Sequence, residues 1–315
     1  MQKGSLIVIA VGGNSLIKDE KHMTVPDQYA AACETMKYIA DIIEQGYRVI
    51  ITHGNGPQVG FILMRSEYSR GILHEVPLDS IDADTQGAIG YNFQMALRNE
   101  FTRRGIKKEV ASIVTQVVVD RDDPAFKNPS KPIGPFYTEE QAKERQSKDG
   151  WIMKEDAGRG WRRVVPSPKP LRIVELEVIK TLVNNDIVTI AVGGGGIPVI
   201  ETPQGLKGVE AVIDKDLASS LLAKNLNADM FIISTAVEKV YLNFNTPQQK
   251  ALDKVSIEEL IKYRAEGHFK PGSMLPKIDA MIDFVSSTGK RGVITCPEKL
   301  PQAVLGESGT IVVKN

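Results

Sequence analysis

The segment SLIVIAVGGN, residues 5–14, determines the predicted fold. Its first seven residues are almost all apolar and several are β-branched, a pattern typical of a parallel strand covered by helices on both faces. The strand runs directly into Gly12, Gly13 and Asn14. A second strand, at residues 47–52, also runs into glycines, and a helix predicted at residues 26–45 separates the two. A strand, a glycine turn and a helix therefore form a repeated unit.

The same alternation continues through most of the chain. Further helices are predicted at residues 78–104, 173–185 and 256–264, and further strands at residues 110–119, 186–196, 230–235, 292–296 and 310–313. Because strands alternate with helices, we predict an α/β protein with an open, mostly parallel sheet and helices on both faces. Ligands of such sheets bind beyond the carboxyl ends of the strands.

One segment, residues 121–170, interrupts the pattern with prolines, charges and both tryptophans. Residues 151–155 and 161–165 flank a turn-rich AGRG and are predicted to form a β-hairpin. We interpret the segment as an inserted, protruding lid subdomain, because long loops in compact proteins are usually functional or disordered. Lys131 lies within PSKPIGP, where proline stiffens the backbone on both sides. Most surface lysines have no specific role, so Lys131 is a candidate only in combination with other residues.

Composition narrows the classes of function. Lys plus Arg and Asp plus Glu each number 39, so the chain has no net charge to attract nucleic acid or an anionic membrane. The apolar run at residues 6–11 is too short to span a bilayer. Cys33 and Cys296 lie far apart without a disulfide spacing pattern, which indicates a reducing compartment and a cytoplasmic protein.

The glycine turns after several strands indicate anion binding. Glycine has no Cβ, so backbone amides can approach an anion that the next helix N-terminus also favours. The alternative for any single turn is ordinary strand-to-helix geometry. Four consecutive glycines at residues 193–196 strengthen the phosphate interpretation, although the sequence matches neither a P-loop nor a G-x-G-x-x-G motif.

The segment GVEAVIDKDLA, residues 208–218, is the candidate chemical centre. It places Asp214, Lys215 and Asp216 between an apolar run and a helical pattern, where buried charges are costly unless they meet a ligand or one another. The alternative is that Asp214 or Asp216 caps the helix. Lys277 is predicted in the first turn of another helix, after Gly272 and Ser273, where its charge opposes the helix dipole unless an anion lies nearby.

Glycine turns, an acid pair and isolated lysines are together suited to phosphoryl transfer. This reaction needs donor and acceptor aligned and the charge of the moving group neutralised. Mg²⁺ would be held mainly by nucleotide phosphates and water, with no dedicated protein ligands. The four histidines lack metal-ligand spacing, and neither a G-x-S-x-G motif nor a redox cysteine pair is present.

The motifs resemble those of carbamate kinases, in the amino acid kinase superfamily, over essentially the whole chain. They occur in the family order: VGGNSL, THGNGPQVG, DDPAFKNPSKPIGPFY, GWRRVVPSPKP, GGGGIPV, GVEAVIDKDLAS and GHFKPGSMLPK. The resemblance implies one amino acid kinase domain over residues 1–315 with an eight-stranded sheet. It further implies a homodimer and reversible transfer between ATP and carbamate, running toward ATP in arginine catabolism. An N-lobe (about 1–185) would bind carbamate or carbamoyl phosphate, and a C-lobe (about 186–315) would bind nucleotide.

The resemblance also assigns roles residue by residue. It implies catalytic roles for Lys131, Lys215, Asp216 and Lys277. Carbamate and the phosphoryl group would meet Gly12, Gly13, Asn14, Gly54, Asn55 and Gly56. The nucleotide would meet Gly194, Gly195, Asp214, Ala236, Val237, Tyr241 and Met274.

Two features bear on this assignment and its rivals. Acetylglutamate kinases carry a catalytic lysine in the first strand, whereas residues 7–11 here are all apolar, so Lys215 and Lys131 are the expected replacements. Ser234 stands where an aliphatic residue is expected near the nucleotide. The rival functions are another amino acid kinase with a different small carboxylate, and a non-catalytic nucleotide sensor.

Overall fold

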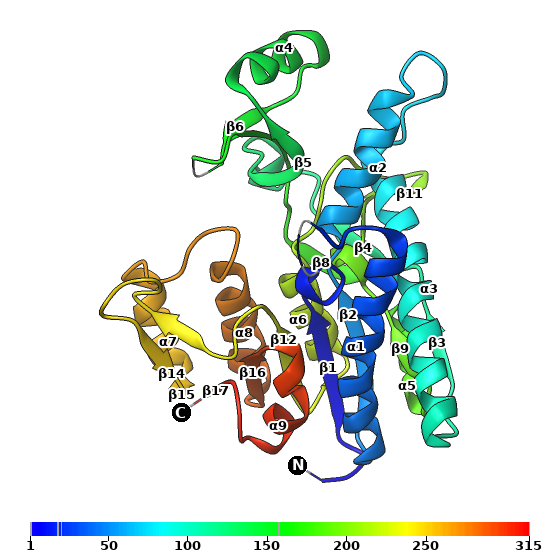
Figure 1. The fold of residues 1–315 in the computed structure, drawn as a ribbon, viewed down its shortest axis with the longest axis vertical. Helices are drawn as coiled ribbons and strands as arrows, with labels where there is room; N and C mark the ends of the chain where they lie inside the picture. Colours follow the sequence, from blue (N-terminus) through cyan, green and yellow to red (C-terminus); the bar gives the residue numbers. More distant parts are fainter. Residues whose placement is uncertain (1, 18, 20, 157, 315) are drawn as a thin grey trace.

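The computed structural model describes residues 2–17, 19, 21–156 and 158–314, and its centre is an eight-stranded sheet (Figure 1). The strand order is β15-β17-β16-β12-β1-β2-β9-β3. Neighbouring strands are parallel except for β16 and β17, which are antiparallel. The strand bounds are β1 Leu6–Val11, β2 Arg48–His53, β3 Val110–Ser112, β9 Val188–Ile190, β12 Met230–Ser234, β15 Lys254–Ser256, β16 Arg291–Thr295 and β17 Thr310–Val313. The predicted mostly parallel α/β sheet is confirmed.

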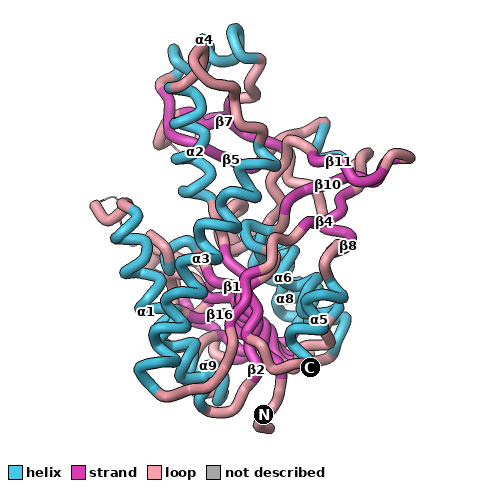
Figure 2. Tube along the Cα trace, turned by 90° about the vertical axis from the view of Figure 1, so that its right-hand side faces the viewer, coloured by secondary structure: helices cyan, strands magenta, loops and turns pink. Residues whose placement is uncertain are grey.

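Helices cover both faces of this sheet (Figure 2). One face carries α1 (Val25–Glu44), α3 (Leu78–Arg104) and α9 (Leu300–Leu305), and the other carries α5 (Leu176–Asn184), α6 (Lys215–Asn225), α7 (Ile257–Ala265) and α8 (Leu275–Thr288). Strand β1 serves both cores: Val8 and Ala10 pack into one, Ile7 and Ile9 into the other. Its uniform apolarity therefore follows from burial on both sides. Within the described ranges, no helix is both long and apolar enough to cross a membrane.

The predicted single strand at residues 110–119 is wrong, because the chain leaves the main sheet in its middle. Strand β3 ends at Ser112, and β4 (Gln116–Val119) joins a second sheet of order β11-β10-β4-β8. Its other strands are β8 (Pro170–Ile173), β10 (Ile197–Thr202) and β11 (Gly205–Gly208). The change of direction is held at Thr115, whose backbone N–H donates to Gln86 Oε1 at 2.7 Å and whose carbonyl accepts from Gln86 Nε2 at 3.0 Å.

Two further boundaries differ from the prediction. Ile173 ends strand β8, so the helix predicted from this residue begins only at Leu176. The strand predicted at residues 186–196 is the short β9, followed by a 3₁₀ turn over Gly193–Gly195. The first turn, at Val174 and Glu175, lies within an amphipathic pattern, and the second follows an apolar run that leads into the glycines.

A small antiparallel sheet of order β5-β7-β6 projects from the main body, together with α4 (Glu139–Asp149) (Figures 1 and 2). Its strands are β5 (Lys131–Tyr137), β6 (Met153–Glu155) and β7 (Trp161–Val165). The β6–β7 pairing confirms the predicted hairpin. This sheet packs on α2 (Gly56–Tyr68), and Arg145 Nη2 bonds Glu67 Oε2 at 3.2 Å beside the helix end. A two-stranded ribbon, β13 (Val240–Leu242) with β14 (Lys250–Leu252), completes the described strands.

Two glycines of α3 should respond oppositely to alanine. A Cβ at Gly90 would lie 2.1 Å from Ser112 Oγ and 2.9 Å from Ser112 Cβ, whereas a Cβ at Gly87 would meet nothing within 4 Å. We expect Gly90→Ala to destabilise the protein by about 1–3 kcal/mol through overpacking. Gly87→Ala should stabilise it by about 0.5–1 kcal/mol, because alanine is the better helix former. Denaturant unfolding of both variants measures the difference; equal effects would contradict the close approach of α3 and β3.

Candidate functional site

Two cavities lie at the carboxyl end of the main sheet and share one wall. The wide cavity has a volume of about 560 Å³ and the narrow cavity about 170 Å³. Ser273 and Lys277 line both. The wide cavity contains the predicted nucleotide residues Ala236, Val237, Tyr241 and Met274. The narrow cavity contains Lys131, Asp214, Lys215 and Asp216 together with Gly54, Asn55 and Gly56.

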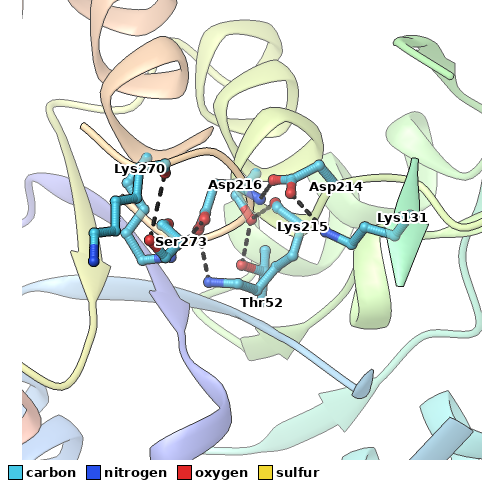
Figure 3. A network of polar contacts seen from close by, with 9 residues as sticks. Thr52, Lys131, Asp214, Lys215, Asp216, Lys270 and Ser273 are labelled. Carbon is cyan, nitrogen blue, oxygen red and sulfur yellow. Dashed lines mark hydrogen bonds and ion pairs between the residues drawn. The ribbon is translucent and has the colours of Figure 1, made fainter. Parts of the chain in front are cut away.

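Asp216 joins two of the predicted lysines, and Figure 3 labels one of them, Lys215. Its Oδ1 accepts from Lys215 Nζ at 2.7 Å and its Oδ2 accepts from Lys277 Nζ at 3.1 Å. Lys215 begins α6 and Lys277 lies in the first turn of α8, so two helix N-termini converge on one carboxylate. Asp216 itself is only 3% exposed. The structure thus brings together residues that are 61 positions apart in the chain.

Asp214 has the capping role that the sequence left open, and a second contact besides. It occupies the N-cap position of α6, where its Oδ1 accepts from the backbone N–H of Asp216 at 2.9 Å. Its Oδ2 accepts from Lys131 Nζ at 2.8 Å. The carboxylate of Asp216 binds lysines instead of capping the helix. Asp214 therefore has the capping role, and Asp216 is the carboxylate that binds the lysines of the site.

The first turn of α6 is fastened to the end of β2 by two hydroxyl groups. Ser219 Oγ donates to the carbonyl of Lys215 at 2.7 Å, which leaves the Ser219 oxygen to accept from Thr52 Oγ1 at 2.6 Å. Lys215 then extends along Gly54, where an added Cβ would lie 3.7 Å from the lysine Cδ. That distance is an ordinary van der Waals contact, so the path of Lys215 does not by itself require glycine at position 54.

The electrostatics of the site are asymmetric. Burial lowers the pKa of Lys215, the nearby Lys277 adds to the effect, and Asp216 opposes it. Burial by itself raises the pKa of Asp216, but the charges of Lys215 and Lys277 outweigh it and hold that pKa well below the usual range. Three lysines face two carboxylates, which leaves one positive charge in excess. Such a site favours an anion.

The glycine turns have packing roles in addition to any ligand contacts. A Cβ at Gly12 would lie 2.7 Å from the carbonyl oxygen of Ser234, so the close approach of β1 and β12 requires glycine there. Gly12 and Gly13 border neither cavity, and the side chain of Asn14 lies outside the described part of the structure.

The glycine run after β9 reaches the narrow cavity through one of the two glycines predicted to meet the nucleotide. Gly194, at φ 69°, borders the narrow cavity beside Asn55 and not the wide cavity beside Tyr241. Gly195 borders neither, and a Cβ there would lie 2.4 Å from the Ile213 carbonyl oxygen. Close packing thus accounts for both glycines, at Gly194 against the Asn55 side chain and at Gly195 against the Ile213 backbone, and their contact with a nucleotide stays a prediction.

Several polar residues at this edge were not identified from the sequence. Lys270 and His268 line the wide cavity. His53, at the end of β2, is buried, and its burial lowers its pKa to about 4. Asp82 and Gln86 of α3 are also buried and contact the glycine turns. For these two residues the available signal was their spacing of four within a helix, which places them on the same face as the buried Leu78 and Ile89.

The described residues form no cluster of three or more His, Cys, Asp or Glu side chains that could hold a metal. Both carboxylates of the narrow cavity already have partners on each oxygen. A cation in this site would therefore rely chiefly on oxygens of a bound ligand and on water, which is common for Mg²⁺.

Comparisons with known proteins agree with this geometry. Residues 5–296 match the model of the amino acid kinase family. The chain is 52% identical to a carbamate kinase of Pyrococcus horikoshii, covering 97% of this chain and 98% of the relative, and 51% identical to one of Clostridium perfringens, covering 98% and 99%. It matches the structure of a Giardia lamblia carbamate kinase bound to AMP-PNP with a TM-score of 0.93 and 42% identity, covering all of both chains. The chain therefore belongs to the amino acid kinase family and, within it, to the carbamate kinases.

Proposed function

We propose that the protein transfers a phosphoryl group reversibly between ATP and carbamate, giving ADP and carbamoyl phosphate. The observation that carries this proposal is the shared wall of the two cavities, where Lys277 borders both and Asp216 links it to Lys215. A nucleotide in the wide cavity and a small acceptor in the narrow one would meet at these ammonium groups. The narrow volume suits an acceptor as small as carbamate.

The residues act by position and charge. Lys215 and Lys277 neutralise the charge that spreads over the moving phosphoryl group, and donor and acceptor are held in line by the cavities on either side. Asp216 raises the pKa of Lys215 against the effect of burial, and it holds the ammonium groups of both lysines at the shared wall. Lys131 approaches from β5, on the side of the narrow cavity. The AMP-PNP complex of the Giardia lamblia relative supports nucleotide binding by this chain.

Mg²⁺ is the expected cofactor. When bound to the nucleotide phosphates it would supply further neutralisation of their charge. This chain's own contribution is the lysine pair and its carboxylate.

A coupled assay tests the function directly. With ADP, Mg²⁺ and carbamoyl phosphate, we expect ATP to form, and with acetylglutamyl phosphate in its place we expect none. ATP formation from acetylglutamyl phosphate would support the other amino acid kinase. Binding of ADP without turnover of carbamoyl phosphate would support the nucleotide sensor and overturn the proposal.

We also propose that the two lobes bind different substrates. All of the residues that line the wide cavity lie between positions 235 and 277, which supports nucleotide binding by the C-lobe, about 186–315. The narrow cavity draws Gly54, Asn55 and Lys131 from the first part of the chain and Lys215 and Lys277 from the second. Carbamate would then bind between the N-lobe, about 1–185, and the first turns of α6 and α8.

We also propose that the protein is a cytoplasmic homodimer that forms ATP during arginine catabolism. Strand β3 is an edge of the main sheet, and the nearby Tyr91 and Val114 are 62% and 56% exposed, which supports a partner there. Cys33 and Cys296 are unpaired, as a reducing compartment would leave them. Light scattering should give twice the 34.6 kDa chain mass. Cells without the gene should lose carbamoyl phosphate-driven ATP formation on arginine.

Lys131→Ala should mainly weaken handling of the carbamoyl group. Lys131 is bound to Asp214 and lines only the narrow cavity of the two, so we expect KM for carbamoyl phosphate to rise about tenfold, the size of one charge-assisted contact, with KM for ADP little changed. Lys143→Ala, which removes an exposed lysine of the neighbouring α4, is the matched control. Unchanged kinetics of Lys131→Ala would remove the protruding sheet from the mechanism.

A further inference from the structure

Helix α3 carries a buried row of polar side chains beneath the narrow cavity. Asp82, Thr85 and Gln86 are 2%, 1% and 3% exposed, although they lie in the interior of a long helix. The Gln86 amide is bonded to main-chain atoms. Its NH₂ group donates to the carbonyl oxygens of Thr115 and Gly193, and its oxygen accepts from the N–H of Thr115. Buried polar groups are costly unless they are bonded, so the partners of Asp82 and Thr85 need to be identified.

Their shared partner is Asn55, a residue that lines the narrow cavity. Asn55 precedes the first residue of α2, where an asparagine side chain normally caps the helix, yet it makes no capping bond. Its Nδ2 instead donates to Asp82 Oδ1 at 3.0 Å and to Thr85 Oγ1 at 2.9 Å. Both amide hydrogens of Asn55 are therefore used by α3.

The hydroxyl group of Thr85 determines which way the Asn55 amide is turned. Thr85 Oγ1 donates its single proton to the carbonyl oxygen of Asp82 at 2.8 Å, so toward Asn55 it can only accept. The Asn55 atom that faces it must be the NH₂ group. The carbonyl oxygen Oδ1 is then the polar atom of the amide that remains for the cavity.

Gly194 makes room for this arrangement. A Cβ at Gly194 would lie 2.3 Å from Asn55 Nδ2 and 3.0 Å from Asn55 Oδ1, and Gly194 itself borders the narrow cavity. Any other residue would displace the amide. The glycine turn after β9 and the polar row of α3 thus hold the same side chain from two sides.

We propose that Asp82 and Thr85 are positioning residues that present the carbonyl oxygen of Asn55 to the narrow cavity, where it accepts a hydrogen bond from the amino group of carbamate. This inference rests on the proposed function and deepens it, because it names the group of the substrate that is recognised. Acetate has the same shape as carbamate but carries CH₃ in place of NH₂, and cannot donate this bond. The arrangement therefore selects the carbamoyl group over the acetyl group.

The ionisation of Asp82 does not disturb this role. Burial raises the pKa of Asp82 well above its usual range, and Oδ2 has no hydrogen-bond partner within the described residues. A proton held on Oδ2 leaves Oδ1 as an acceptor for Asn55. The ionised carboxylate accepts there as well.

The test compares two stable analogues that differ in this one group, phosphonoacetamide (NH₂) and phosphonoacetone (CH₃). Calorimetry should show the unmodified protein binding the amide about tenfold more tightly than the ketone, as one hydrogen bond to a buried acceptor implies. In the double variant Thr85→Val/Asp82→Leu the Asn55 amide loses both acceptors and can turn over, so the preference should fall to within about twofold, and each single variant should lower it part of the way. Asp82→Asn retains an acceptor oxygen and should keep the preference.

The measurements distinguish a misfolded variant, a failure of this inference and a failure of the proposed function. ADP affinity, measured for every variant, reports the wide cavity and shows that the variant is folded; Thr85→Val preserves shape and provides the test if Asp82→Leu does not fold. Equal binding of the two analogues by the unmodified protein, or an undiminished preference in Thr85→Val, would overturn the inference. Absence of ATP formation from carbamoyl phosphate by the unmodified protein would instead overturn the proposed function.

Discussion

Alanine in place of Lys215 is expected to lower kcat about a thousandfold while changing ADP affinity less than about threefold. Lys215 Nζ lies at the narrow cavity, held by Asp216 at 2.7 Å, and is not among the residues that line the wide cavity. Under the proposed function, its contact with the phosphoryl group would strengthen in the transition state, where negative charge spreads over that group. Removal should therefore affect the transition state more than bound nucleotide. Steady-state kinetics with ADP and carbamoyl phosphate, together with calorimetry of ADP, measure the two quantities.

Lys224→Ala is the matched control, because Lys224 lies in the same helix and pairs with Asp283 away from both cavities. Its kcat should stay within about twofold of the unmodified enzyme, as for other surface ion pairs. Lys277→Ala should resemble Lys215→Ala. If either loses kcat and ADP affinity in equal measure, that lysine is a nucleotide-binding residue and not a phosphoryl ligand.

The fold could be predicted where local sequence and tertiary environment agree. Helix α3 begins after Pro77 and ends before Gly105, which adopts φ 70°, and its predicted limits match those observed. Strand β1 was recognisable because burial on both faces requires an unbroken apolar run. Residues 110–119 are also rich in β-branched residues and were predicted as one strand, but there the chain changes sheet at Thr115 through bonds to Gln86, 29 residues away. The hydrophobic periodicity of a segment reflects its local structure and cannot reveal a hydrogen bond to a residue distant in the sequence.

In the site, too, some features follow from the local sequence and others depend on tertiary contacts. Lys215 and Asp216 could be singled out because adjacent charges beside an apolar run are unusual. Asn55 was expected at the substrate, but its orientation depends on Asp82 and Thr85, which only the fold brings to it. Gly194 was assigned by its motif to the nucleotide, whereas its neighbours in space are those of the narrow cavity. Glycine patterns identify close backbone approaches without identifying what approaches.

Asp216→Asn is expected to have the largest effect on stability, about 3–5 kcal/mol of unfolding free energy at neutral pH, because it leaves buried charges without their partner. The substitution preserves shape, but it exposes Lys215 and Lys277 to one another without the carboxylate between them. The unfolded-state pKa is near 3.8 and the folded-state pKa is lower, so the contribution of Asp216 is present above about pH 4 and is lost as pH falls through the folded-state pKa. Melting temperatures across pH should show the two proteins converging in acid.

The pH dependence of kcat at alkaline pH should also report the charge of Asp216, through its effect on the pKa of Lys215. Burial and Lys277 already lower the pKa of Lys215, and Asp216 is what raises it. Without Asp216 that pKa falls further, so the lysine loses its proton, and the enzyme its activity, at a lower pH. We therefore expect the alkaline limb of the kcat profile of Asp216→Asn to move toward neutral pH. A mere loss of packing would lower kcat by the same factor at every pH.

Asp283→Asn separates a charge that organises the site from a charge that pairs at the surface. Asp283 also accepts from a lysine, Lys224, at 2.7 Å, but its side chain is 41% exposed, so solvent can replace the partner and the cost should be below about 1 kcal/mol. Its pH profile should match that of the unmodified enzyme, because neither cavity contains it. If Asp216→Asn proved as mild as Asp283→Asn and left the alkaline limb in place, then Lys215 would keep its charge and both lysines their positions without Asp216, and the central role assigned to this carboxylate would be wrong.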